Sequence, residues 1–83
     1  MNNTARKLNT SEMCIIDTTG DTKYIWDVNN EDEVEVARNM FNQLKKKNYV
    51  AYSVGRNGKK DEIIREFDET LGKIIMIPPV IGG

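Results

Sequence analysis

The last six residues are the part of the sequence whose types and spacing could do chemistry. Pro78 and Pro79 follow an apolar run, two further apolar residues come next, and Gly82 and Gly83 end the sequence. A terminal Gly-Gly presents an α-carboxylate with no Cβ nearby, so it can enter a narrow channel and approach a nucleotide phosphate closely. The carboxylate could then be adenylated and transferred to a sulfur or nitrogen nucleophile. We therefore expect a C-terminal activation site at Gly82 and Gly83.

Pro78 and Pro79 are expected to form the exit of this tail, because consecutive prolines favour an extended conformation. Neither proline can donate a ladder hydrogen bond, so the pair must also end any strand before it. Two alternatives for the tail stay open at this point. It could be a chain end without chemistry, or it could only dock onto a partner.

Other residues give no comparable signal, and we expect no catalytic residue, metal site or cofactor. The chain has no histidine, which excludes His-based triads and most metal sites. Its single cysteine, Cys14, lies in an apolar run and is interpreted as a small buried side chain. The acidic run 31–35 suits a helix N-terminus without a metal. The segment 55–60 lacks the spacing of a phosphate loop and is interpreted as a basic turn. The chain is therefore not expected to be an enzyme.

The length, net charge and apolar runs of the chain exclude further classes of protein. A chain of 83 residues has room for one domain. Twelve Lys and Arg stand against 13 Asp and Glu, for a net charge of −1, whereas nucleic-acid binders normally show a basic surplus. No apolar run approaches the roughly 20 residues of a membrane span, and the first residues lack the apolar core of a signal peptide. We expect a cytoplasmic protein without a membrane or nucleic-acid partner.

The clearest local pattern predicts a helix over 31–47. Asn30 can cap its start, and acidic residues at the start and lysines at 45–47 both suit the helix dipole. Asn48 tolerates the left-handed conformation that ends helices. One apolar stripe recurs at intervals of three and four residues: Val34, Ala37, Phe41 and Leu44, with Met40 beside it.

Strands are predicted on both sides of this helix. Runs 13–17 and 22–27 flank a Gly-Asp pair and form a hairpin. Runs 49–54, 62–67 and 73–77 follow the helix, and a tight helical turn ending at Gly72 precedes the last one. A helix over 61–71 stays open as an alternative, because Ile63, Ile64, Phe67 and Leu71 also fit a helical face. This order predicts a small α+β fold in which the helix packs on a sheet. We expect Ile15, Ile25, Val50 and Ile75 to face the helix, a flexible arm over 1–11, and one domain over 12–83 with its tail at 78–83.

The segment 73–83, with its Pro-Pro-Val-Ile-Gly-Gly ending, resembles the C-terminus of the small subunit of molybdopterin synthase, a ubiquitin-like sulfur carrier. The close likeness covers about the last ten residues, and the order of elements extends it coarsely over 13–83. The resemblance implies a β-grasp-like fold and a distant ubiquitin-like protein. It also implies activation of the tail by an adenylyltransferase of the ubiquitin-activating type. A C-terminal thiocarboxylate for a sulfur acceptor enzyme, or an isopeptide bond to a conjugation target, would follow.

Two other functions are kept beside the carrier hypothesis. The first is a small non-catalytic interaction or regulatory module, of phage or mobile-element origin, which docks through its sheet or its last strand. The second, weaker alternative is a nucleic-acid accessory protein that uses the lysines at 45–47 and the basic residues of 56–60.

Overall fold

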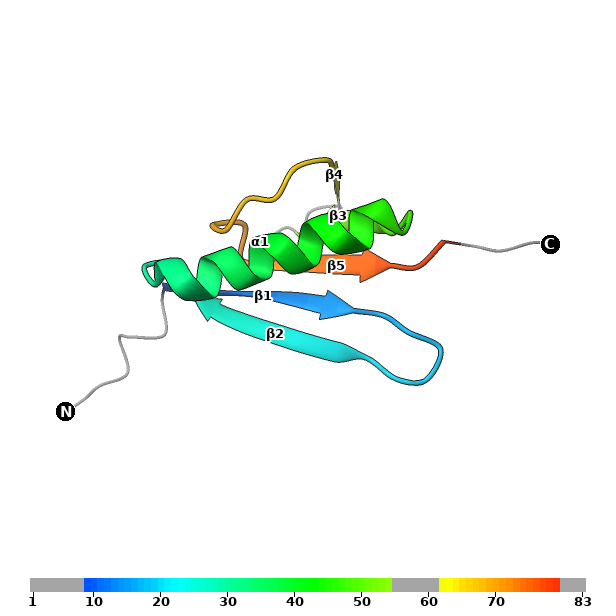
Figure 1. Cartoon of the computed structure of the whole chain (residues 1–83), viewed down its shortest axis with the longest axis horizontal. Helices are drawn as coiled ribbons and strands as arrows, with labels where there is room; N and C mark the ends of the chain where they lie inside the picture. Colours follow the sequence, from blue (N-terminus) through cyan, green and yellow to red (C-terminus); the bar gives the residue numbers. More distant parts are fainter. Residues whose placement is uncertain (1–8, 55–61, 80–83) are drawn as a thin grey trace.

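The computed structural model describes residues 9–54 and 62–79. Five strands and one helix follow each other in the predicted order, strand-strand-helix-strand-strand-strand (Figure 1). Their bounds are β1 (Thr10–Ile15), β2 (Thr22–Asp27), α1 (Glu31–Lys46), β3 (Val50–Ser53), β4 (Glu62–Ile64) and β5 (Lys73–Ile77).

All five strands form one mixed sheet with the order β2-β1-β5-β3-β4. The central pair, β1 and β5, is parallel, and every other neighbouring pair is antiparallel. The helix α1 crosses one face of this sheet (Figure 1). The predicted fold class is therefore confirmed: the protein is a small α+β domain with a β-grasp-like sheet on one main helix.

The first strand starts earlier than predicted. Ser11, assigned above to the N-terminal arm, is part of β1 and only 4% exposed. Its hydroxyl accepts a hydrogen bond from the backbone N–H of Gly72, and the N–H of Glu12 donates to the carbonyl of Gly72 at 2.9 Å. These bonds join the start of β1 to the residue that precedes β5, which gives Ser11 a structural role.

The helix has both of the predicted ends. The side chain of Asn30 accepts from the N–H groups of Asp32 and Glu33, as a capping residue should. Glu33 does not complete a capping box, since its carboxylate accepts from the N–H of Asp27 at the edge of β2. At the other end, Asn48 has a φ of 71°, the left-handed conformation expected there.

The core lies between α1 and the near face of the sheet. Among the residues that the structure describes, eight apolar side chains are buried: Met13, Trp26, Val34, Ala37, Phe41, Ala51, Ile74 and Met76. The predicted helix stripe is confirmed, because its members on α1 are buried or half-buried against this cluster.

Three of the four sheet residues expected to face the helix do not. Ile15 packs on the core, but Ile25 is 54% exposed, and Val50 and Ile75 lie on the far face. Residues 74–77 are all apolar, and in 50–54 the bulkier apolar side chains, Val50 and Tyr52, take the outward places while Ala51 points inward. Alternation along these strands therefore does not reveal which set points inward. Their register against β1 decides it, since Ile74 pairs with the buried Met13.

The segment after β4 also differs from the prediction. The strand ends at Ile64 instead of residue 67, and the chain then passes to the helix side of the sheet. There the ring of Phe67 lies 5.6 Å from that of Trp26 and 5.7 Å from that of Phe41. A turn closed by a bond from the N–H of Leu71 to the carbonyl of Asp68 replaces the predicted helical turn.

Phe41→Ala tests this packing. Phe41 is 1% exposed, so truncation leaves a cavity between α1 and the aromatic cluster. We expect the free energy of unfolding, measured by urea denaturation, to fall by about 3–5 kcal/mol. Val36→Ala on the solvent side of α1, where the side chain is 47% exposed, is the control and should change it by no more than about 0.5 kcal/mol. A loss below about 1 kcal/mol for Phe41→Ala would contradict the core described here.

Candidate functional site

The predicted tail exit lies at the end of the central strand. Ile77 is the last residue of β5 and pairs with Val50 of β3, while the N–H of Ile16 donates to the carbonyl of Met76. Pro78 and Pro79 follow directly and lie outside the ladder, as their missing N–H groups require. The structure thus places the diproline where the chain leaves the middle of the sheet.

Gly82 and Gly83, the predicted activation site, lie outside the described residues. The activation site therefore stays a prediction from the sequence. The basic turn predicted at 55–60 lies outside them as well.

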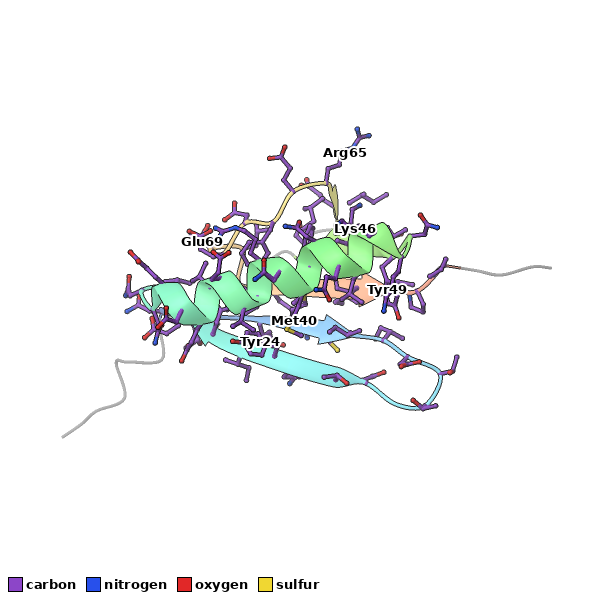
Figure 2. The ribbon with its side chains drawn as sticks, in the orientation of Figure 1. Tyr24, Met40, Lys46, Tyr49, Arg65 and Glu69 are labelled. Carbon is purple, nitrogen blue, oxygen red and sulfur yellow. The ribbon has the colours of Figure 1, made fainter. Side chains whose placement is uncertain are left out.

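Two lysines lie at the end of the molecule where β5 ends. The helix α1 ends on the same side as β5, and its last turn carries Lys45 and Lys46 (Figure 1). Figure 2 shows Lys46 and Tyr49 at this end, and Glu69 at the opposite end. The acidic residues of the first helical turn lie at the other end of α1, so the charges of the helix itself are polarised along its axis.

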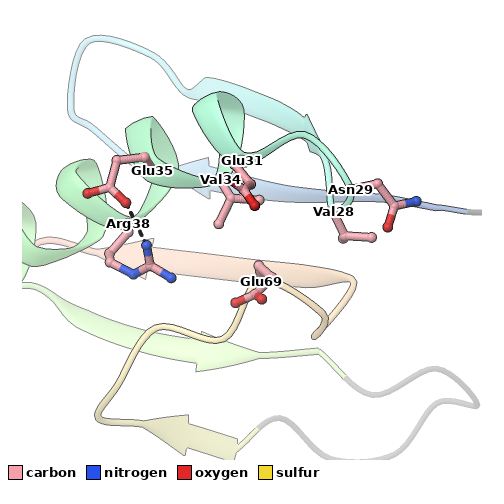
Figure 3. Close-up of a pocket in the computed structure, with 7 residues that line it drawn as sticks. All are labelled: Val28, Asn29, Glu31, Val34, Glu35, Arg38 and Glu69. Atoms are coloured by element: carbon pink, nitrogen blue, oxygen red, sulfur yellow. Dashed lines mark hydrogen bonds and ion pairs between the residues drawn. The ribbon is translucent and has the colours of Figure 1, made fainter.

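A cleft of about 470 Å³ lies at the acidic end, between the first half of α1 and the segment 68–72 (Figure 3). It is lined by Val28, Asn29, Glu31, Val34, Glu35, Arg38 and Glu69. Three carboxylates, an amide, a guanidinium and two valines therefore share the lining.

Arg38, which carries the guanidinium of the cleft, already pairs with Glu35 and packs on Phe67. One of its terminal nitrogens lies 2.7 Å from a carboxylate oxygen of Glu35, and its carbon lies 5.6 Å from the centre of the Phe67 ring. The backbone carbonyl of Glu69 accepts a hydrogen bond from the indole of Trp26 at 3.2 Å. These contacts hold the wall of the cleft in place. The described lining holds carboxylates, an amide and a guanidinium, but no nucleophilic side chain.

Asp68 organises the turn that carries Glu69. Its carboxylate accepts from the hydroxyl of Thr70 at 2.7 Å and from the N–H of Thr70 at 2.9 Å. These two hydrogen bonds favour the charged form and lower the pKa of Asp68 below its ordinary value of 3.8, against a small opposing effect of burial.

The acidic run at 31–35 does not come together as one site. Glu31 and Glu35 line the cleft, whereas Glu33 is turned toward β2. Among residues 9–54 and 62–79, no group of three or more His, Cys, Asp or Glu could hold a metal ion. The cleft itself could not be foreseen, because Glu69 and Arg38 are brought together only by the tertiary fold.

Cys14 is not the buried core residue that its apolar run suggested. It is half-buried and lies on the sheet face away from α1, opposite Ile75 in the β1–β5 pairing. The alternation along β1 explains this position, since Met13 and Ile15 take the inward places.

The fold and its central-strand exit define a small β-grasp-like α+β domain. No family model, curated protein or solved structure matches the chain. In the part of the chain that the structure describes, α1 is neither long nor apolar enough to cross a membrane.

The hydrogen bonds of Asp68 predict how the stability of the fold changes at low pH. A pKa lower in the folded than in the unfolded state stabilises the fold above the unfolded value, and this stabilisation is lost as the pH falls through the folded value. Thr70→Ala removes the hydroxyl donor, so NMR titration should show the pKa of Asp68 rising toward 3.8. The difference in the free energy of unfolding between Thr70→Ala and the wild type should shrink as the pH falls below 3.8.

Thr70→Ser is the matched control, because it restores the donor and should keep the low pKa. An unchanged Asp68 titration in Thr70→Ala would contradict the assigned hydrogen bond.

Proposed function

We propose that the protein is a ubiquitin-like carrier whose reactive group is the carboxylate of Gly83. An adenylyltransferase of the ubiquitin-activating type would activate this carboxylate. The acyl group would then pass to sulfur, for delivery to a sulfur acceptor enzyme, or to an amine of a conjugation target. The protein would be a substrate of these enzymes and not a catalyst.

One observation carries the proposal: the chain leaves the sheet from the end of its central strand, through Pro78 and Pro79, toward Gly82 and Gly83. The strand β5 is held by β1 on one side and β3 on the other, so its end is a firm anchor. The four residues after Pro79 can span at most roughly 14 Å. A carboxylate on such a tether could enter an active site while the domain stays outside.

The chemistry needs no side chain from the tail. A carboxylate oxygen attacks the α-phosphorus of ATP, and pyrophosphate leaves. An amine of a target can then displace AMP, losing a proton and forming an amide. Alternatively, the terminal sulfur of a persulfide displaces AMP, and a second thiol of the sulfur donor breaks the S–S bond to release the thiocarboxylate. Each reaction needs only the α-carboxylate of Gly83 from this chain.

Deleting Gly82 and Gly83 tests the proposal. The deletion moves the terminal carboxylate to Ile81, which is two residues closer to the sheet and carries a branched side chain. It does not touch the described core, so the unfolding midpoint should stay the same. Modification should be abolished, and intact-protein mass spectrometry of the chain isolated from its native cell measures this. In the wild type we expect either the mass increase from replacing one oxygen by sulfur or a conjugate of higher mass linked through Gly83.

A second variant with one alanine added after Gly83 keeps both glycines but converts the carboxylate of Gly83 into a peptide carbonyl. Activation chemistry should be lost in this variant, whereas a tail that only docks should tolerate the addition. If only unmodified chain is found while the activating enzyme is present, the carrier function is wrong.

A further inference from the structure

The strand β2 lies at one edge of the sheet, so half of its backbone groups point away from the other strands (Figure 1). Just beyond β2, the N–H of Val28 donates to the carbonyl of Asn9, and this bond continues the β1–β2 register. Because bonded and outward positions alternate, the even-numbered residues of β2 bond to β1. Lys23, Ile25 and Asp27 therefore point their N–H and C=O groups outward. We call this row the β2 edge.

The opposite edge of the sheet is much shorter. The N–H of Val54 donates to the carbonyl of Lys73, which fixes the alternation along β3. Glu62 and Ile64 consequently bond to β3. Of the three residues described in β4, Ile63 alone points its backbone groups outward. The β2 edge is thus the place where another strand could add to this sheet.

The β2 edge is complementary to a second copy of itself. In an antiparallel pair centred on Ile25, each Ile25 lies opposite its own copy, and Lys23 lies opposite Asp27 of the other copy. These three side chains share one face of the sheet, since alternate residues of a strand do. Opposite charges and apolar residues that face each other across strands stabilise such a pair. Ile25 is 54% exposed and can make this contact.

A contact with α1 closes one end of the β2 edge. The carboxylate of Glu33 accepts a hydrogen bond from the N–H of Asp27 at 2.8 Å, and the N–H of Asn30 donates to the carbonyl of Asp27 at 2.9 Å. A carbonyl can accept two hydrogen bonds, but an N–H group donates only one. The carboxylate thus takes the place that the carbonyl of Lys23 from a second copy would need.

The first turn of α1 is held against β2 by a further contact. The hydroxyl of Tyr24 donates to the backbone carbonyl of Glu33 at 3.4 Å. The Tyr24 ring in turn stacks on the ring of the buried Trp26, with centroids 6.0 Å apart. The position of Glu33 over the β2 edge is therefore part of the packed structure.

We propose that Glu33 keeps the protein monomeric by closing the β2 edge against a second copy of the chain. Unpaired edges are sites of unwanted strand pairing, and folded proteins block them with charged side chains. In the two-fold pair, both copies of Asp27 would donate to Lys23, so Glu33 removes two hydrogen bonds from each dimer. This role explains why Glu33 bonds to β2 and not back to Asn30, as a capping box requires. It is independent of the tail chemistry.

Sedimentation of the full chain and of Glu33→Ala, from micromolar to millimolar concentrations, tests the proposal. The wild type should stay monomeric, whereas the average mass of Glu33→Ala should rise and level off at dimer. We expect the dissociation constant to fall at least about tenfold, because two hydrogen bonds become possible. Glu33→Gln keeps an oxygen acceptor and should stay monomeric. Asp32→Ala removes a carboxylate from the same helical turn but leaves the bond from Asp27 in place, and it should also stay monomeric.

A second change identifies the surface. Ile25→Lys, added to Glu33→Ala, places like charges opposite each other at the centre of the pair and should restore the monomer. Circular dichroism establishes that the variants are folded. A folded Glu33→Ala that stays monomeric at millimolar concentration would overturn the proposal. Association that survives Ile25→Lys, or a wild type that associates as strongly as Glu33→Ala, would overturn it as well.

Hydrogen exchange of the wild type decides the matter should Glu33→Ala fail to fold. The amide of Asp27 should exchange more slowly than the outward amides of Lys23 and Ile25, because the carboxylate of Glu33 accepts its hydrogen bond. Equal exchange at the three positions would contradict the closed edge.

Discussion

The position of Phe67 determines how the second half of the chain is arranged. Its ring contacts Trp26 of β2 and Phe41 of α1, and the guanidinium of Arg38 lies over it. This contact draws the segment after β4 across the core, so that the chain re-enters the sheet at Gly72, beside β1. The central place of β5, and with it the exit at Pro78, depends on that crossing.

The sequence predicts the elements well where the signal is local. Asn30, the helix stripe and Asn48 act through neighbours a few residues away, so they define α1 without knowledge of the sheet. The facing of β3 and β5 depends instead on pairing with β1, which is distant along the chain. The early end of β4 depends on Phe67 finding the core, and no pattern near residue 64 signals that contact.

The candidate sites also differ in whether local sequence or only the tertiary fold reveals them. The tail is recognised from residue types alone, because the diproline and the two glycines have conformational consequences wherever they occur. The cleft joins residues of α1 and the segment 68–72, so only the folded chain defines it. Which side of β5 meets the helix depends on its register against β1, and this register places Ile74 and Met76 inside and Ile75 and Ile77 on the other face.

The exit of the tail and the core share one strand. Ile74 and Met76 of β5 are buried in the core, and Ile77 ends the same strand immediately before Pro78. Because β1 and β3 pair with β5 on its two sides, the exit can move only if these ladders open. The packing that stabilises the domain therefore also fixes the point from which the tail leaves the sheet.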